Sequence, residues 1–243
     1  MVAKRKPVTM KRDIQAVFFD AGYTLLCMDP DQRTLFLRAC AQLEIEIVAE
    51  KFDEAAARAN ALLAPRKPGA VPTPYSQEAV DRFWTSYNRT LLSACARHPE
   101  DAAKAGPLYQ CFTAAMGWRI YHEVRPVLSR LRERGMRLGV ISNWTGDLED
   151  VLRSVGLHQE FDFILDSARL GHEKPHGEIF REALKRAGVA CDSALHVGDS
   201  PEHDVDGALG CELGALLLDR TGRYEGFSRV PRISSLEGLF EHV

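Results

Sequence analysis

The chain contains 243 residues, of which 45% are hydrophobic and 27% are charged, and its formal net charge is −3. This composition is typical of a folded globular protein, and the length suffices for one large α/β domain or for a core that carries an inserted subdomain. A slightly acidic chain lacks the broad positive surface with which proteins neutralise nucleic-acid phosphates. We therefore expect no nucleic-acid partner.

The first residues of the chain and the pattern of its cysteines indicate where in the cell the protein is expected. Residues 1–12 carry five cations but no apolar run, which predicts a flexible, solvated tail rather than a secretory signal. No stretch approaches the roughly 20 apolar residues of a membrane span. The six cysteines are scattered without a CxxC pair, so neither a zinc site nor a disulfide framework is indicated. We expect a cytoplasmic protein with no membrane partner. The cations of the tail are Lys4, Arg5, Lys6, Lys11 and Arg12.

In chain order, the first predicted element is a buried strand over residues 14–19. This segment is short and rich in β-branched and aromatic residues. It ends at Asp20-Ala21-Gly22, a sequence typical of a turn. Asp20 is therefore expected at the carboxyl end of a strand.

From about residue 31 to residue 115 the pattern becomes helical. Leu35, Ala39 and Leu43 illustrate the helical spacing of apolar residues, and no convincing strand is present. The proline-rich segment 65–74 interrupts this pattern and is expected to form a loop. The whole stretch predicts a helical subdomain inserted after the first strand.

After Pro126, predicted helices and strands alternate. Gly135, Gly156, Gly188 and Gly210 each stand just past a predicted helix, where a left-handed closing residue is expected. Such alternation predicts a doubly wound, Rossmann-like parallel sheet with helices on both faces. The predicted elements are helices 127–134, 148–155, 178–187 and 205–209, strands 137–141, 161–165, 194–197 and 215–218, and a further short strand and helix within 224–243.

We thus expect two domains and a tail. The α/β core comprises residues 13–28 together with 118–243, and an all-helical cap comprises residues 29–117. Ligands of an open parallel sheet bind in the crevice at the carboxyl ends of the strands. Polar residues at those ends are therefore the candidates for function.

Four predicted strand ends carry such residues. Asp20 follows the first strand, and Ser142 and Asn143 follow strand 137–141. Lys174 lies beyond strand 161–165, and Asp199 follows strand 194–197. Because the carboxyl ends of parallel strands lie along one edge of a sheet, these side chains are expected to converge on one crevice.

At these positions the sequence resembles the haloacid dehalogenase superfamily. Phosphatases of this superfamily carry a DxDx[TV] motif, a hydrophobic-Ser/Thr motif, a lysine and a GDxxxD motif in this order. Four motifs in register over almost the whole chain are specific, although each alone is weak. The resemblance implies a magnesium-dependent phosphohydrolase that acts on a small phosphorylated metabolite. The matching segments are Asp20-Ala21-Gly22-Tyr23-Thr24, Val140-Ile141-Ser142-Asn143, Glu173-Lys174-Pro175 and Gly198-Asp199-Ser200-Pro201-Glu202-His203-Asp204.

The chemistry of these residue types agrees with the resemblance. A carboxylate in line with a phosphoryl group can accept it, which makes Asp20 the expected nucleophile. Ser142 and Lys174 are expected to assist catalysis by stabilising charge on the phosphoryl oxygens. The expected phosphate and substrate contacts are Thr24, Ser142, the backbone N–H of Asn143, Trp144 and Lys174.

The metal site can be predicted in the same way. Magnesium prefers oxygen ligands, which a strand-end carboxylate, a backbone carbonyl and loop carboxylates supply. The expected ligands are Asp20, the Gly22 carbonyl and Asp199, with Asp204 binding directly or through water. His196 lies inside a predicted strand and is expected to be a packed core residue rather than a catalyst.

One position departs from the superfamily pattern. Its phosphatases place a second aspartate two residues after the nucleophile, as the general acid for the leaving group, and this chain has Gly22 there. Loss of a positioned acid costs about 10²–10⁴ in rate. One interpretation is a hydrolase that acts on substrates with good leaving groups or recruits another acid, such as His172 or His176.

Two other interpretations stay open. A 2-haloacid dehalogenase, which needs no metal, carries Asp-Ala-Tyr-Gly-Thr, close to residues 20–24 with the central pair exchanged. The carboxylates Asp199 and Asp204 would repel an organic acid. We therefore rank this interpretation below that of a phosphohydrolase. The other alternative is a binding module that retains magnesium and phosphate without turnover.

Overall fold

The computed structural model describes residues 13–63 and 76–243. The predicted basic tail and the predicted proline-rich loop 65–74 lie outside the described residues. The chain divides into two compact units. The sheet unit contains described residues 13–27 and 120–243, and the helical unit contains described residues 28–63 and 76–119.

The sheet unit is built on six parallel strands, which confirms the predicted fold class. Strand β1 lies inside the sheet between β4 and β6, with Ala16 opposite both Arg137 and Ala194. This central place explains why all four residues of β1 are apolar and buried. In the order in which they pair, the strands are β5 (Phe163–Asp166), β4 (Arg137–Ser142), β1 (Ala16–Phe19), β6 (Ala194–Gly198), β7 (Gly214–Leu218) and β8 (Arg232–Ile233).

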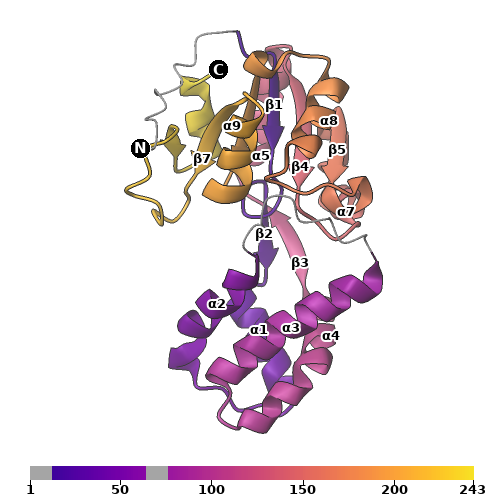
Figure 1. Cartoon of the computed structure of the whole chain (residues 1–243), viewed down its shortest axis with the longest axis vertical. Helices are drawn as coiled ribbons and strands as arrows, with labels where there is room; N and C mark the ends of the chain where they lie inside the picture. The colour runs from indigo at the N-terminus through magenta and orange to yellow at the C-terminus, as the bar shows by residue number, and fades with distance from the viewer. Residues whose placement is uncertain (1–12, 64–75) are drawn as a thin grey trace, which may run out of the picture. The chain divides into compact units, whose positions relative to one another are not determined.

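Helices cover both faces of this sheet, as Figure 1 shows with α8 and α9 in front and α5 behind. Side chains alternate between the two faces of a strand. Phe18 of β1 packs edge-on against Phe163, with ring centroids 5.5 Å apart, and belongs to the same core as Phe180 of α8. Phe19 contacts Phe161, with centroids 6.4 Å apart. The helices are α5 (Val124–Glu133), α6 (Leu148–Ser154), α7 (Ser167–Leu170), α8 (Gly177–Ala187) and α9 (Asp206–Gly210), with shorter 3₁₀ turns at His158–Glu160, Cys191–Ser193 and Leu236–Glu241 and a π-helical turn at Pro201–Val205.

Three of the four predicted helix-closing glycines are confirmed. Gly135, Gly156 and Gly188 have φ values of 75°, 70° and 69°, in the left-handed region. The prediction for Gly210 is wrong, because this residue is the last of α9 itself. The left-handed residue there is Glu212, with φ 62°, whose N–H donates to the carbonyl of Leu209 at 3.2 Å.

The helical unit has the predicted helical character. Its core contains Phe36, Phe52, Tyr87, Leu91 and Leu108, which are buried at helical spacing. Within residues 13–63 and 76–243, no helix combines the length and apolar character that a membrane crossing requires. The elements are α1 (Gln32–Gln42), α2 (Phe52–Asn60), α3 (Gln77–Cys95) and α4 (Ala105–Ala115), with 3₁₀ turns at Ala49–Lys51, Ala61–Leu63 and Pro99–Lys104.

Two short strands were not predicted from the sequence. Strand β2 (Leu26–Asp29) pairs with β3 (Gly117–Ile120) in a separate two-stranded sheet. The chain passes between the two units within these strands, since the units divide after Cys27 and before Ile120. Four-residue strands of mixed burial carry little periodicity, which explains why sequence patterns do not reveal them.

Candidate active site

The sheet edge formed by the carboxyl ends of β1, β4 and β6 gathers the predicted site residues. Asp20 directly follows β1, and its N–H donates to the carbonyl of Val197 at 2.9 Å, which extends the strand ladder by one bond. Ser142 is the last residue of β4, and Asp199 follows the last residue of β6. The backbone of Asp20 is thereby fixed to the neighbouring strand β6.

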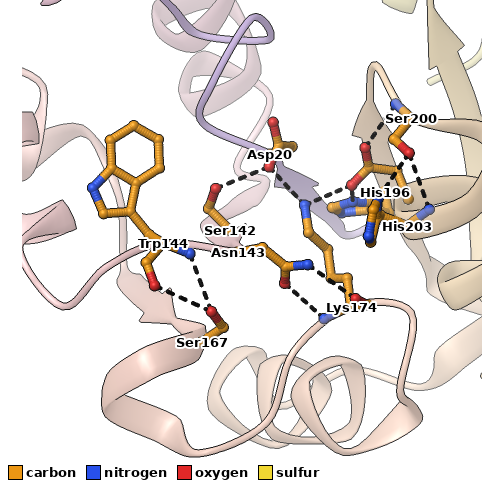
Figure 2. Close-up of polar contacts among 10 residues, drawn as sticks. Asp20, Ser142, Asn143, Trp144, Ser167, Lys174, His196, Ser200 and His203 are labelled. Carbon is orange, nitrogen blue, oxygen red and sulfur yellow. Dashed lines mark hydrogen bonds and ion pairs between the residues drawn. The ribbon is translucent and has the colours of Figure 1, made fainter. Parts of the chain in front are cut away.

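Polar contacts centred on Lys174 join residues that are distant in sequence (Figure 2). The Lys174 Nζ donates to Asp20 Oδ1 and to Asp204 Oδ1, each at 2.6 Å. The Ser142 hydroxyl donates to the same oxygen of Asp20 at 2.9 Å. Oδ2 of Asp20 receives no hydrogen bond from any described residue. One oxygen of this carboxylate is therefore held in place, and the other is left for a ligand.

Lys174 is not an ordinary loop lysine, because its side chain is only 2% exposed. Burial alone would lower the pKa of this ammonium, but the charges of Asp20 and Asp204 outweigh burial and raise it. Asn143 holds the backbone of Lys174 at both polar groups. Its Nδ2 donates to the Lys174 carbonyl at 2.9 Å, and its Oδ1 accepts from the Lys174 N–H at 2.7 Å. The predicted role of the Asn143 backbone N–H stays a prediction.

Three carboxylates of the site form a possible metal-binding group. The ligand oxygens of Asp20, Asp199 and Asp204 all lie within 4.8 Å of one another. Burial, together with the charges of Asp20 and Asp204, raises the pKa of Asp199 to about 8. A divalent cation would relieve this repulsion, so the oxygen donor set fits magnesium. Gly22 lies in the turn after β1, where it forms a bridge with Leu26.

Among the three carboxylates of this group, Asp204 contacts the most described residues. Burial would raise its pKa, but Lys174 and the hydrogen bond with His196 hold the pKa well below its usual range. Its Oδ1 contacts Lys174 Nζ and lies 2.9 Å from His196 Nε2, while Oδ2 accepts from the Ser200 N–H at 3.0 Å. With three of its lone pairs engaged, Asp204 fits a water-mediated metal contact as well as a direct one.

The sequence analysis gave His196 too small a role. The side chain is fully buried, and its ring packs edge-on against Phe180, with centroids 5.2 Å apart, which agrees with the predicted core position. However, Nε2 also contacts Asp204, and Nδ1 has no hydrogen-bond partner among the described residues. A neutral ring that donates from Nε2 avoids burying an unpaired N–H. The signal that could have found this contact is a polar residue in a central strand three positions before Asp199.

Thr24, Gly22 and Trp144 lie at or near the loop that follows β1. Thr24 is fully buried, and its hydroxyl has no hydrogen-bond partner among the described residues. The Trp144 ring lies over Gly22, since a Cβ added at Gly22 would be 3.4 Å from its Cζ3 atom. A buried hydroxyl without a protein partner can form its hydrogen bond with a bound ligand.

Two further residues at the end of β5 were not singled out from the sequence. Ser167 Oγ accepts from the Trp144 N–H at 3.1 Å. Asp166 stands opposite Ser142 in the sheet, and its carboxylate accepts from Leu148 N–H at 3.3 Å and from Ala168 N–H at 2.9 Å. Burial raises the pKa of Asp166. These contacts fix the loop after Ser142, and the rule that polar residues gather at strand ends would have found both.

The chain is similar to several known proteins. It is 40% identical over 114 residues to mouse (Mus musculus) haloacid dehalogenase-like hydrolase domain-containing protein 3, which is 47% of this chain and 45% of that protein. The match thus spans about half the length of that relative. This chain is also 29% identical over 246 residues to phosphoserine phosphatase of Thermus thermophilus. That alignment covers 89% of this chain and 97% of that enzyme.

A solved structure shows the same fold. The crystal structure of HAD phosphatase from Thermococcus onnurineus superimposes with a TM-score of 0.59 and 21% identity, covering 93% of this chain and 96% of that chain. The family model for haloacid dehalogenase-like hydrolases matches residues 14–211, a range that contains every site residue predicted from the sequence. The chain therefore belongs to the haloacid dehalogenase-like hydrolase family.

Proposed function

We propose that the protein is a magnesium-dependent phosphohydrolase that transfers a phosphoryl group from a small phosphorylated metabolite first to Asp20 and then to water. The arrangement around Asp20 carries this proposal. One carboxylate oxygen is held by the buried Lys174 and by Ser142, and the other oxygen has no donor among the described residues. A carboxylate that is oriented but not fully occupied suits nucleophilic attack.

In the first step, Oδ2 of Asp20 forms a bond to phosphorus, and the bond between phosphorus and the leaving-group oxygen breaks. Negative charge on the phosphoryl oxygens is met by the Lys174 ammonium and the Ser142 hydroxyl. In the second step, water attacks phosphorus, the bond to Asp20 breaks, and inorganic phosphate is released. Lys174 Nζ also keeps Oδ1 of Asp20 in place for the next cycle, because the two atoms lie 2.6 Å apart.

The metal-binding residues in this proposal are Asp20, Asp199 and Asp204, together with the Gly22 carbonyl. The grouping of three carboxylates and the raised pKa of Asp199 support a divalent cation at this position. When bound, magnesium supplies positive charge that stabilises the transferring phosphoryl group. Asp204 is held by Lys174 and His196, so its carboxylate is oriented before any ligand arrives.

Further contacts of the phosphate are assigned to Thr24, the backbone N–H of Asn143 and Trp144. The unpaired, buried hydroxyl of Thr24 supports a polar ligand near that residue. The role of residues 29–117 as a cap that selects the substrate stays a prediction. The name of the Thermus relative, phosphoserine phosphatase, supports a small phosphate ester as the substrate class.

Release of inorganic phosphate tests this proposal against the alternatives. Wild-type protein is incubated with p-nitrophenyl phosphate or acetyl phosphate, with and without magnesium, and halide release is measured from 2-chloropropionate. We expect magnesium-dependent phosphate release and no halide. Halide release without metal would favour a dehalogenase, and thermal stabilisation by magnesium without any turnover would favour a binding module.

A further inference from the structure

The loop that carries Gly22 and Thr24 has an unusual backbone at Tyr23. This residue has φ 57°, in the left-handed region that side chains other than those of Asn and Asp seldom adopt. Its N–H donates to the Leu26 carbonyl at 2.6 Å, and the N–H groups of Leu25 and Leu26 both donate to the carbonyl of Ala21 at 2.9 Å. A strained residue in a tight turn persists only where the surroundings hold it.

Arg220 supplies such a contact from a distant part of the chain. It lies two residues after β7 and is separated from the loop by almost two hundred residues. Its Nε donates to the carbonyl of Tyr23 at 3.2 Å, and its Nη2 donates to the carbonyl of Thr24 at 2.8 Å. The guanidinium thus binds two consecutive carbonyls, on the strained residue and on the site residue next to it.

The guanidinium is itself held in place. Arg220 Nη1 lies 2.5 Å from a carboxylate oxygen of Glu123, whose side chain is only 1% exposed. The Arg220 guanidinium carbon lies 3.6 Å from the centre of the Tyr121 ring, which is a close cation–π contact. Burial would raise the pKa of Glu123, but its backbone and Arg220 lower it. The guanidinium thus contacts two backbone carbonyls, one carboxylate and one aromatic ring.

We propose that Arg220 is a positioning residue that holds the loop after β1 in the conformation the active site needs. This inference rests on the proposed function, in which Gly22 and Thr24 contact metal and phosphate. Lysine cannot replace arginine here, because a single ammonium cannot contact two carbonyls and a carboxylate in the way that three guanidinium nitrogens do. Arg220 acts through the loop backbone and does not touch the reacting atoms.

Arg220→Lys tests this role, because it keeps the charge beside Glu123 while removing the fork. The matched control is Arg223→Lys, since Arg223 is exposed and lies near the ring of Tyr224. Amide hydrogen exchange is followed at residues 21–26, magnesium alone is titrated by calorimetry, and kcat and KM are measured with p-nitrophenyl phosphate. For Arg220→Lys we expect roughly tenfold faster exchange in the loop, roughly tenfold weaker magnesium binding and roughly tenfold lower kcat. The control should match wild type.

A second substitution tests the physical cause. Asparagine adopts the left-handed region more readily than tyrosine. If Arg220 supports the strained backbone of Tyr23, the effect of Arg220→Lys on loop exchange should shrink in a Tyr23→Asn background. An effect of the same size in both backgrounds would refute this cause.

Several results would overturn the proposal. Unchanged loop exchange in Arg220→Lys would do so, and so would exchange that rises equally throughout the sheet, which indicates a general loss of stability. If Arg220→Lys does not fold, the double variant Arg220→Met/Glu123→Gln removes both charges and takes its place in the same measurements. A wild-type protein that neither binds magnesium nor releases phosphate would refute the proposed function and this role within it, whereas a defect confined to Arg220→Lys would not touch the proposed function.

Discussion

The two units use their buried polar residues in different ways. In the helical unit, the buried side chains of Asn88 and Asp101 have partners close in sequence: Asn88 donates to the carbonyl of Trp84 at 2.9 Å, and Asp101 pairs with Lys104 at 2.9 Å. In the sheet unit, Lys174 contacts Asp20 across 154 residues of sequence, and Ser142 contacts it across 122. Buried polar side chains such as Asn88 and Asp101 thus make local contacts in the helical unit, whereas those of the sheet unit at Asp20 form one shared site.

This difference teaches how a site can be told from ordinary packing. A buried polar group with a neighbour three or four residues away is satisfied by its own helix. A buried lysine that pairs with two distant carboxylates is satisfied only when the segments that carry them have come together. Burial of charge costs free energy unless it is compensated, so such a network is retained where function requires it. The predictions below test this contrast.

The largest effect is expected from Lys174→Met. This change leaves Asp20 and Asp204 without their shared cation, which should lower stability by about 3–5 kcal/mol and the melting temperature by on the order of 10 °C. Phosphate release should fall by roughly 10²–10³-fold. The matched change in the helical unit is Lys104→Met, whose lysine is 42% exposed and should contribute about 1 kcal/mol or less. Calorimetric melting and a phosphate assay check both variants, and equal destabilisation by the two would contradict the contrast.

Gly22→Asp should raise activity rather than lower it. Gly22 is not in the left-handed region, and an added Cβ would make only an ordinary contact with the Trp144 ring. A restored acid should speed hydrolysis of alkyl phosphates by up to about 10²-fold, and by less for aryl phosphates, whose phenolate leaves without a proton. Steady-state kinetics on both substrate types check this. A folded, magnesium-binding variant without any gain on alkyl phosphates would show that the missing acid is not limiting.

His196→Phe should affect the metal more than the fold. The phenyl ring can keep the packing against Phe180 but cannot donate to Asp204. We expect magnesium affinity to fall roughly tenfold, with partial recovery in His196→Gln, which can donate a hydrogen bond. In the helical unit, Tyr87→Phe removes contacts with Gln32 and Asn60 at 2.7 Å each and should lower stability by about 1–2 kcal/mol without changing magnesium affinity. Isothermal titration measures the magnesium affinity of both variants, and thermal melting measures their stability. An unaltered magnesium affinity in His196→Phe would show that His196 does not support the metal site.

The smallest effect concerns pH. In the metal-free protein, burial and the charges of Asp20 and Asp204 raise the pKa of Asp199 to about 8, whereas the unfolded chain releases this proton near pH 4. The proton therefore stabilises the folded state at low pH, and this contribution is lost as the pH rises through about 8. Magnesium must displace the proton, so it should raise the melting temperature more at pH 8 than at pH 6. Asp199→Asn should abolish that difference, and a larger shift at pH 6 would contradict the assignment.

Much of the fold could be predicted from local patterns. The strand before Asp20 is wholly apolar and short, and the helices of both units show clear helical spacing, so periodicity alone identifies them. The paired strands β2 and β3 and the true closing residue of α9 could not be predicted, because they depend on tertiary pairing and on Glu212 taking a left-handed backbone. Local sequence does not encode such choices.

The candidate site shows the same division. Asp20, Ser142 and Lys174 could be predicted because strand-end position and motif order mark them, and the structure brings them together. The contact of His196 with Asp204 was missed: a polar residue in a central strand close to Asp199 marks the position, but the sequence does not show which neighbour the ring contacts. The contacts of Arg220 with the loop after β1 could not be predicted either. They are made to backbone carbonyls, which every residue type has.

The most direct test of the central claim is to find the phosphoryl group on Asp20. Wild-type protein is mixed with acetyl phosphate and magnesium, quenched in acid within one turnover, digested and examined by peptide mass spectrometry. We predict that the peptide containing Asp20 gains the mass of one phosphoryl group, and that Asp20→Asn shows neither this label nor phosphate release, while the exposed control Asp53→Asn shows both. Phosphate release by Asp20→Asn at the wild-type rate, or a label on another residue, would contradict the account.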